Sequence, residues 1–345
     1  MQIENEVKNL SKVTTADIAR MVGVSPSAVS IALNGKPGIS ESTRARILGA
    51  VRQSGYLQNA PGRLASTHSN IAVLFRNEFS LQDRLFYVEL NTSVMEACEQ
   101  LPFNLIFAST YYKGNELTFS EVLRSDMIDG ILSYGDIDPI VFSELKALNL
   151  PIVVLDSSRR AEDFYLSVQV DYEHAAYSAT KHLIDLGHRD IALIGNSKLQ
   201  DFNLLVFEGF QRATSEANIA LGTNRIQLNV YDEASLDSCV DDALSGKQMP
   251  TAFFCATDYY AMRTLARLHH KGIRVPEDIS VIGIDDVVSS KYLVPALTTM
   301  AVDRNQMGRL GIDLLQKAIR GEACASVVLP RCSLMIREST AAPRG

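Results

Sequence analysis

The chain lacks the features that mark several common protein classes. No stretch approaches the roughly 18 to 20 uninterrupted apolar residues that a membrane-spanning helix needs, so we expect no membrane association. The first residues are polar and lack the apolar core of a secretory signal, which favours a cytoplasmic location. No two cysteines have Cys-x-x-Cys spacing, which predicts buried thiols rather than disulfides or a metal site for Cys98, Cys239, Cys255, Cys324 and Cys332.

Motifs for catalysis and cofactor binding are also missing. The sequence has no GxGxxG or GxxxxGK[ST] loop to hold a phosphate, no HExxH and no GxSxG. His182 and His188 flank the end of an expected helix, where imidazoles more often pair with helix carbonyl groups than act as catalysts. We therefore expect neither enzymatic activity nor a cofactor.

Charge is unevenly distributed along the 345 residues. Residues 1–70 contain eight Lys and Arg and four Asp and Glu, a net charge of +4. Because the whole chain carries −7, the remainder carries −11. The length suits about two domains, and a basic head on an acidic body favours a head that binds a polyanion.

The head begins with a helix-start pattern. Thr14 is followed three positions later by Asp17, a spacing typical of a capping box, and apolar residues then recur with helical spacing up to Gly23. Ser25 and Pro26 suit the start of a second helix, because serine caps free N–H groups and proline loses no bond in the first turn.

Two further helices complete the pattern. The second helix has an inward apolar stripe formed by Ala28, Val29, Ala32 and Leu33, and a third helix is expected from Ser40, with Ile47, Leu48 and Val51 buried. This arrangement predicts a helix-turn-helix whose second helix reads the major groove of double-stranded DNA. The alternative is a small helical module that binds protein.

The body alternates short apolar runs with helical stretches. The expected strands are residues 71–75, 103–108, 129–133, 151–156, 190–195, 251–256 and 279–285. Such alternation predicts parallel sheets covered by helices on both faces. The similar spacing of 71–156 and 190–285 favours two doubly wound lobes with a cleft between them, and one long sheet is the alternative. Open parallel sheets bind ligands at the carboxyl ends of their strands.

These motifs resemble the lactose-repressor (LacI/GalR) family of bacterial transcription regulators. The resemblance is carried in the head by DIARMVGVSPSAVSIALNGKPGISESTRARI and in the body by LIDLGHRDIALIG and GIRVPEDISVIGIDD, and it extends from about residue 13 to 340. It implies a helix-turn-helix domain at 13–58, a hinge at 59–69 and a periplasmic-binding-protein-like body at 70–340. The expected lobes are approximately 70–171 with 300–326, and 172–299 with 327–340.

The resemblance also implies which residues contact DNA. They are Thr14, Thr15, Ser25, Pro26, Ser27, Ser30, Ile31, Asn34, Asn59, Arg63, Leu64 and Ala65. Pro26, Ser27 and Ile31 occupy the positions that face base edges. Many relatives have a hydrogen-bonding residue where this chain has Ile31, and isoleucine offers only apolar contact, for instance to a thymine methyl group.

The hinge departs further from the family pattern. Relatives insert a leucine between base steps in the minor groove, and alignment on Asn59 and Arg63 puts Ala65 at that position. Leu64 is one residue earlier, so either Leu64 acts as the wedge in a shifted register or the wedge is weak.

For the body, the resemblance implies a small effector between the lobes. The candidate wall residues are Phe86, Tyr87, Asp156, Gln200, Phe202, Tyr231, Asp258 and Asp285. Aromatic rings offer flat apolar contact and carboxylates accept hydrogen bonds, although Asp156 and Asp258 could instead cap helices. Val206 stands where many sugar-responsive relatives have an arginine, so a sugar cannot be assumed. We expect either a pocket more apolar than usual or a response to something else, including a protein partner.

The sequence therefore predicts a DNA-binding transcriptional regulator, most simply a repressor. We expect a homodimer on a pseudo-palindromic operator, with DNA affinity modulated by the effector. A regulator controlled by a protein partner is the alternative, and a two-lobed enzyme or a solute-binding protein is a remote one.

Overall fold

The computed structural model describes residues 14–33, 38–53, 69–76, 81–99, 101–113, 116–125, 127–158, 165–196, 201–246 and 248–344. The chain divides into two compact units, Met1–Thr67 and His68–Gly345. No single helix in these ranges is long and apolar enough to cross a membrane; the helices Thr15–Val22 and Pro26–Leu33 reach that length only as a pair bent by 105°.

The first unit contains the three expected helices, α1 (Thr15–Val22), α2 (Pro26–Leu33) and α3 (Glu41–Gln53). The predicted capping box is confirmed, since Thr14 accepts from the N–H of Asp17 while the Asp17 carboxylate accepts from the N–H of Thr14. Gly23 ends α1 with a φ of 72°, a left-handed conformation that glycine adopts without strain. The helix-turn-helix prediction is therefore confirmed.

A small apolar core joins these helices. Its fully or nearly fully buried members are Ile18, Ala19, Val22, Val29, Ala32, Ile47 and Val51. Leu48, expected to be buried, is only half-buried. Two arginines of α3 bind the ends of the other helices: Arg46 donates to the carbonyl of Val22 at 2.7 Å, and Arg44 to that of Ala32 at 3.2 Å. Part of the head's positive charge therefore stabilises the carboxyl ends of α1 and α2.

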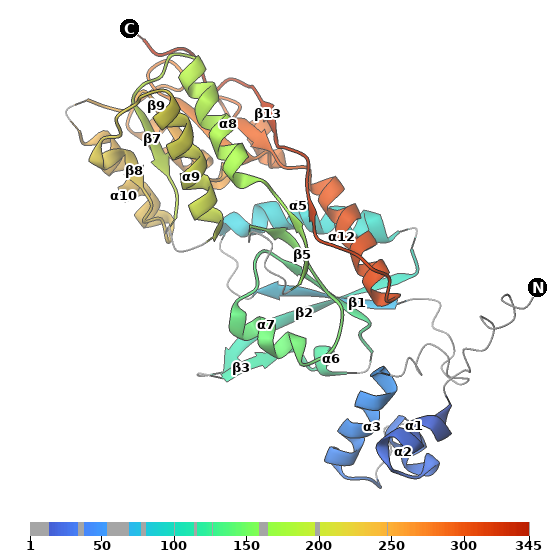
Figure 1. Cartoon of the computed structure of the whole chain (residues 1–345). Coiled ribbons are helices and arrows are strands. Elements are labelled where there is room, and N and C mark those ends of the chain that lie inside the picture. The colour runs from blue at the N-terminus through green and yellow to red at the C-terminus, as the bar shows by residue number, and fades with distance from the viewer. Residues whose placement is uncertain are drawn as a thin grey trace, which may run out of the picture. The chain divides into compact units, whose positions relative to one another are not determined.

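The second unit has two lobes, each built on one sheet (Figure 1). In the described residues of the first lobe, seven strands lie in the order β12-β6-β5-β4-β1-β2-β3. They are β1 (Ser69–Arg76), β2 (Phe103–Lys113), β3 (Glu116–Phe119), β4 (Gly130–Tyr134), β5 (Ile152–Ser157), β6 (Leu166–Gln169) and β12 (Val327–Val328). All neighbours pair in parallel except β2 and β3, which are antiparallel.

Helices cover both faces of this sheet. They are α5 (Leu81–Cys98), α6 (Glu121–Arg124), α7 (Pro139–Lys146) and α12 (Arg304–Ile319). Alternate residues of β1 lie on opposite faces of the sheet. Ile71 and Val73 belong to the core that includes residues of α5 and α12. Ala72 and Leu74 belong to the core that includes residues of α6 and α7. The run at 71–75 is therefore apolar throughout, as expected for a strand buried on both sides.

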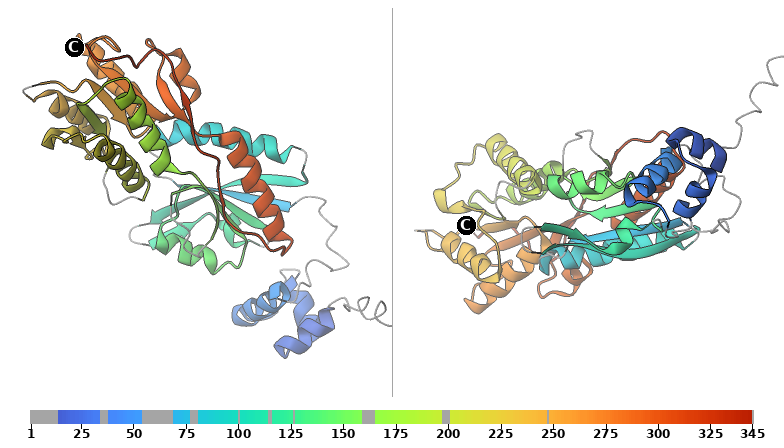
Figure 2. Two further views of the ribbon diagram at one scale, coloured as in Figure 1. Left: turned by 45° about the horizontal axis from the view of Figure 1, so that its top comes forward. Right: turned by 90° about the horizontal axis from the view of Figure 1, so that it is seen from below.

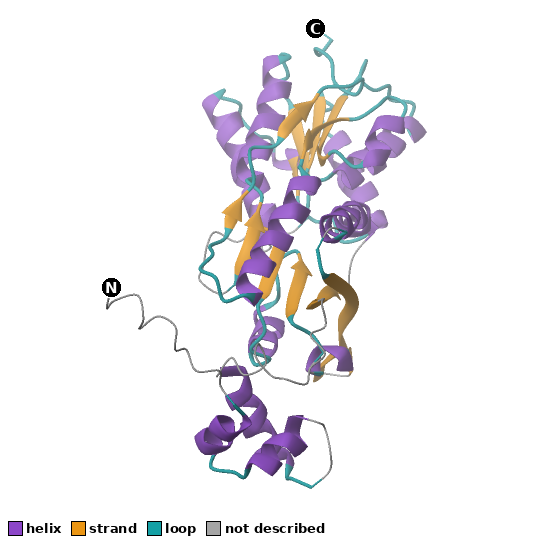
Figure 3. Cartoon of the chain, turned by 90° about the vertical axis from the view of Figure 1, so that its right-hand side faces the viewer, coloured by secondary structure: helices purple, strands orange, loops and turns teal. Residues whose placement is uncertain are grey.

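The second lobe repeats the plan with the strand order β13-β11-β10-β9-β7-β8 among the described residues. Its strands are β7 (Ile191–Ile194), β8 (Ile226–Gln227), β9 (Ala252–Cys255), β10 (Ser280–Asp285), β11 (Thr298–Ala301) and β13 (Ser333–Met335). Only β11 and β13 pair antiparallel. The helices are α8 (Tyr172–Asp185), α9 (Asp201–Glu216), α10 (Glu233–Leu244) and α11 (Asp258–His270), with short helices η1 (Thr223–Arg225) and η2 (Val288–Tyr292). Figure 3 shows helices flanking both sheets.

The chain passes between the lobes after β6, after β11 and after β12. Figure 2 shows the red C-terminal segment returning from the end of α12 in the first lobe to the second lobe. Two strands differ from the approximate lobe boundaries. Strand β12, at 327–328, pairs with β6 in the first sheet, and β11 extends the second lobe to residue 301. Both are short edge or near-edge strands that local sequence patterns do not reveal.

Candidate DNA-reading surface and effector region

Helix α2 turns one face to solvent and the other to the core of the head. Pro26, Ser27 and Ser30 are exposed, whereas Val29 and Ala32 are buried. Ser25 precedes the helix, and its hydroxyl accepts a hydrogen bond from the N–H of Ala28 at 3.2 Å. These exposed side chains make up the outward face of α2, which is the candidate DNA-reading surface.

Three predicted DNA contacts are hydrogen-bonded or partly buried within the head itself. The Thr14 hydroxyl lies 2.6 Å from Asp17, and hydrogen bonds from Thr14 lower the pKa of that carboxyl. Thr15 is half-buried at the start of α1. Ile31 is also half-buried, and Gly38 lies beside it, since a Cβ atom at Gly38 would be 3.8 Å from the end of the Ile31 side chain. Only part of the apolar surface of Ile31 is therefore exposed.

Several predicted contacts lie outside the residues that the structure describes. They are Asn34, Asn59, Arg63, Leu64 and Ala65 in the head and hinge, and Gln200 in the body.

In the body, Asp156 lies at the carboxyl end of β5 with a φ of 62°. Its two carboxylate oxygens accept hydrogen bonds from tyrosines of both lobes: Tyr87 on α5 at 2.9 Å and Tyr172 at the start of α8. Burial raises the pKa of Tyr172 well above its ordinary value, and the nearby charges of Asp156 and Asp285 raise it further. Asp156, Tyr172 and Asp285 are therefore close neighbours, although Asp156 and Asp285 belong to different sheets.

Aromatic rings surround this group of polar residues. Phe86 packs edge-on against Tyr87, with ring centroids 5.4 Å apart, and Tyr87 stacks on Tyr134 at 5.6 Å. Within the second lobe, Phe202 of α9 meets Tyr172 edge-on, with ring centroids 4.6 Å apart. Phe86, Tyr87 and Phe202, which the sequence named separately, thus lie near one polar group, and we define the effector region as these three residues with Asp156, Tyr172 and Asp285.

Asp285 ends β10 and is largely buried. Burial raises the pKa of its carboxyl well above the ordinary value, and the charge of Asp258 raises it further. Its carboxylate lies 3.4 Å from the backbone nitrogen of Asp258. A carboxyl group with a raised pKa retains a proton and can donate as well as accept hydrogen bonds.

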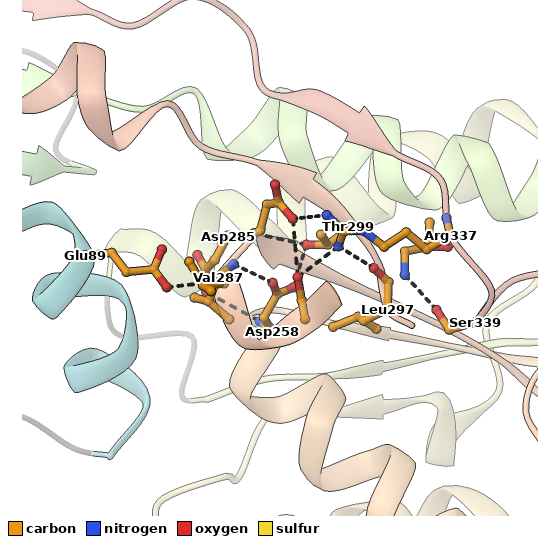
Figure 4. Close-up of polar contacts among 12 residues, drawn as sticks. Glu89, Asp258, Asp285, Val287, Leu297, Thr299, Arg337 and Ser339 are labelled. Atoms are coloured by element: carbon orange, nitrogen blue, oxygen red, sulfur yellow. Dashed lines mark hydrogen bonds and ion pairs between the residues drawn. The ribbon is translucent and has the colours of Figure 1, made fainter. Parts of the chain in front are cut away.

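Asp258 does not contribute to an accessible wall, contrary to its sequence assignment. It is 0% exposed, and its carboxylate accepts from the hydroxyl of Thr299 and, at 3.1 Å, from the N–H of Val287 (Figure 4). The reason is its position as the first residue of α11, beneath the turn that follows β10. The Asp258 carboxylate therefore links that turn to α11 through its hydrogen bond with Val287.

Tyr231 is 70% exposed, in the turn between β8 and α10. Its N–H donates to the Ser235 hydroxyl at 2.9 Å. Val206, at the position of the family arginine, is 1% exposed and packs in the core.

Sequence reasoning missed several residues of this region. Tyr172 touches Asp156, Glu89 and Arg304 contact the turn after β10, and Arg337 pairs with Asp286. Nothing in the local sequence distinguishes these residues, because each acts through a partner far along the chain.

Comparisons with known proteins agree with both parts of the chain. Residues 14–59 match the family described as bacterial regulatory proteins, lacI family, and residues 180–340 match the periplasmic binding protein-like domain. The chain is 30% identical over 334 residues to catabolite control protein A of Priestia megaterium, which covers 95% of this chain and 99% of the relative. It is 29% identical to the HTH-type transcriptional repressor PurR of Histophilus somni, over 89% of this chain and 92% of that protein.

Solved structures share the architecture. A complex of the transcriptional regulator CelR with cellobiose superposes with a TM-score of 0.68 at 25% identity, covering 95% of this chain and 99% of that one. The lac repressor dimer bound to operator superposes with a TM-score of 0.66 at 22% identity, covering 96% and 100%, a likeness of fold. On the basis of these matches, the chain belongs to the lacI family of bacterial regulatory proteins and is a DNA-binding transcriptional regulator.

Proposed function

We propose that this regulator is a repressor that binds a pseudo-palindromic operator as a homodimer and responds to a small effector held between the lobes. The observation that carries the effector proposal is the hydrogen bonding of Asp156 to Tyr87 of the first lobe and to Tyr172 of the second. Asp156 and Asp285 end parallel strands of two different sheets, which is where open α/β sheets bind ligands. A ligand that touches both residues would bind both lobes at once.

For DNA, we propose that α2 enters the major groove. The exposed side chains of Pro26, Ser27 and Ser30 support this role, because a helix fits the groove and reads it through its outward face. Ile31 would add apolar contact, for instance to a thymine methyl group. Ser25, Ser30 and Asn34 would contact the DNA backbone, and Thr14 and Thr15 remain proposed DNA contacts. Asn34, Asn59 and Arg63 lie outside the described residues.

Selection of genomic fragments by the full chain tests the DNA proposal. We expect fragments that share one near-symmetric sequence, and binding that weakens steeply as salt is raised. On that sequence, Ser27→Ala should reduce affinity about tenfold and leave binding to unrelated DNA nearly unchanged. Ser245→Ala, which alters an exposed serine at the end of α10 in the body, is the control. Failure to enrich a shared sequence would contradict the proposal.

For the effector, we propose contacts from Phe86, Tyr87, Asp156, Phe202, Tyr231 and Asp285, with Gln200 added from outside the described residues. Asp258 is left out because its carboxylate has no exposed surface. Flat rings with carboxyl groups between them suit a small molecule that has an apolar face and hydroxyl or amine groups. A sugar remains one candidate, without the arginine that Val206 replaces.

A thermal-shift screen of sugars, nucleosides and amino acids tests this site. A compound that binds only the folded chain should raise its unfolding temperature. Asp285→Asn and Asp156→Asn should reduce that shift. Asp242→Asn, an exposed change on α10, should not. A compound whose shift survives both site variants binds elsewhere and contradicts the assignment.

Exposed apolar side chains support the homodimer. Val88 and Met95 on α5 are 65% and 51% exposed, and Tyr292 and Val294 after β10 are 79% and 97% exposed. Where exposed apolar side chains adjoin, they form surfaces of the kind that bind another protein. Sedimentation should therefore give a dimer for the full chain, and Tyr292→Lys with Val294→Lys should shift it toward the monomer. A monomer at micromolar concentration that binds one half-site as tightly as the full site would contradict the homodimer.

A further inference from the structure

Residues 285–290 form a turn after β10 that we name the 285–290 corner. It begins with two consecutive aspartates of positive φ, 131° at Asp285 and 54° at Asp286. Non-glycine residues adopt this region at a cost and keep it only where their surroundings fix the backbone. The neighbours of the corner therefore decide where the Asp285 carboxyl lies.

Arg304 binds the strained backbone directly. Its guanidinium donates to the carbonyl oxygen of Asp285 and, at 2.7 Å, to that of Asp286. Arg304 is the first residue of α12, where the positive end of the helix dipole disfavours a cation, and its side chain is only 13% exposed. Its position is thus explained by the two carbonyl groups and not by the helix that carries it.

Glu89 joins this arrangement from the first lobe. One carboxylate oxygen lies 2.9 Å from the guanidinium of Arg304, and the other accepts the N–H of Val288 at 2.7 Å. Figure 4 shows Glu89 on α5 approaching the corner opposite Asp258. A single carboxylate of the first lobe therefore contacts the corner both directly and through Arg304.

Other contacts hold the corner within its own lobe. Asp258 accepts the N–H of Val287, and Arg337 pairs with the Asp286 carboxylate and donates to the Ser290 hydroxyl at 2.8 Å. The corner should therefore keep its fold when the contacts to Glu89 are removed. The two sets of contacts have separable roles, since one shapes the corner and the other fastens it to the first lobe.

We propose that Glu89 and Arg304 are positioning residues that form a latch between the lobes. Arg304 holds the backbone that carries the Asp285 carboxyl, and Glu89 ties that backbone to α5, the helix that also carries Phe86 and Tyr87. A ligand that displaces Asp285 then shifts α5 relative to the second lobe. The effector role of Asp285 in this sentence rests on the proposed function, whereas the latch itself does not.

Amide hydrogen exchange in the full chain, without DNA or effector, tests the latch. Glu89→Ala removes both contacts, and we expect the Val288 amide to exchange at least about tenfold faster. Glu89→Gln retains an oxygen that accepts from Val288 but loses the ion pair, so its effect should be smaller. Arg304→Lys keeps the charge but cannot bond both carbonyl groups in the same way, so Val288 exchange should also accelerate.

Controls separate the latch from general destabilisation. Glu96→Ala changes an exposed acid on the same helix and should leave Val288 exchange unchanged. Ile282 within β10 should stay within about twofold of the wild-type rate in every variant. Because Glu89 and Arg304 act as one unit, the double variant Glu89→Ala with Arg304→Lys should exchange no faster at Val288 than the faster of these two single variants.

Three results would overturn the latch: unchanged Val288 exchange in Glu89→Ala, equal acceleration at Ile282, or additive effects in the double variant. The measurement uses neither DNA nor ligand. Its failure therefore leaves the proposed regulation untouched, and failure of the ligand screen leaves the latch untouched.

Discussion

The hydroxyl of Tyr87 donates a 2.9 Å hydrogen bond to the carboxylate of Asp156, which joins α5 to the end of β5. The Tyr87 ring stacks on Tyr134, with an angle of 15° between the ring planes, so its orientation is fixed independently of the hydroxyl. The close approach also requires Gly135, because a Cβ atom there would lie 2.7 Å from the Tyr87 hydroxyl oxygen. Ring stacking, turn geometry and hydrogen bonding thus converge on one residue of the proposed effector site.

Tyr87→Phe should keep the ring and lose the hydrogen bond. We expect the free energy of unfolding to fall by about 1 kcal/mol, because the bond is partly buried and Asp156 keeps the bond from Tyr172. Denaturant unfolding measures the change. Tyr177→Phe, which removes a surface hydroxyl bonded to Glu216 at 2.8 Å, is the matched control and should change stability less. Equal losses in the two variants would contradict this view of Tyr87.

Gly209 allows α8 and α9 to approach each other closely. A Cβ atom at this position would collide with the carbonyl oxygen of Glu173 and lie 2.8 Å from the backbone nitrogen of Tyr177. Since both are backbone atoms, the helices themselves would have to move. We expect Gly209→Ala to lower the free energy of unfolding by about 3 kcal/mol, despite the better helix propensity of alanine.

Gly222→Ala is the control for this prediction. Gly222 is exposed in the same lobe, and a Cβ atom there would meet its neighbours at 3.5 Å and beyond, which is ordinary contact. Thermal unfolding should show a small change for Gly222→Ala and a large one for Gly209→Ala. A wild-type unfolding temperature in Gly209→Ala would mean that the helices can separate at little cost.

The features that the sequence predicted correctly are local ones. The capping box at Thr14 and Asp17, the proline start of α2 and the apolar central strands all depend on residues close together in the chain. The strands β3, β6, β8, β11, β12 and β13 were not predicted, since segments of two to four residues carry little periodicity. Their formation depends on the neighbouring strand rather than on their own composition.

The candidate site was predicted only in part, because some of its residues follow local sequence patterns and others depend on distant contacts. Strand-end residues such as Asp156 and Asp285 follow apolar runs, so their place at the carboxyl edges could be inferred from sequence. The burial of Asp258 could not, because it depends on Thr299 and Val287 folding over it. The ion pair between Glu89 and Arg304 could not be predicted from sequence either, since it requires α5 and α12 to lie side by side.

The hinge prediction concerns Leu64 and Ala65, which lie outside the described residues. If Leu64 is the minor-groove wedge, Leu64→Ala should weaken operator binding and leave non-specific binding nearly unchanged, while Ala65→Leu should do little or interfere. If the family register holds instead, Leu64→Ala should be nearly silent and Ala65→Leu should tighten binding and increase DNA bending. Titrations at fixed salt with bending measured alongside distinguish the registers, and no change in either variant would contradict wedge insertion.

Burial also gives Asp258 an unusual response to pH. It raises the pKa of this carboxyl from 3.8 to about 7, although hydrogen bonds from Thr299 and Val287 act in the opposite direction. In the unfolded chain the group loses its proton near its ordinary pKa, whereas the folded chain retains the proton until about pH 7. Between these values the folded state binds more protons, so the contribution of Asp258 to stability is present below about pH 4 and is lost as pH rises toward 7.

Asp258→Asn should remove this dependence, because asparagine has nearly the shape of the protonated acid and cannot ionise. As the pH rises from 5 to 8, the wild type should lose stability and the variant should not. Over this range the free energy of unfolding of the variant should therefore increase by about 2 kcal/mol relative to that of the wild type. Denaturant unfolding of both proteins at pH 5, 6, 7 and 8, at fixed ionic strength, measures the change. A difference that stays constant over this range would show that Asp258 is ionised in the folded protein throughout, and that Thr299 and Val287 outweigh its burial.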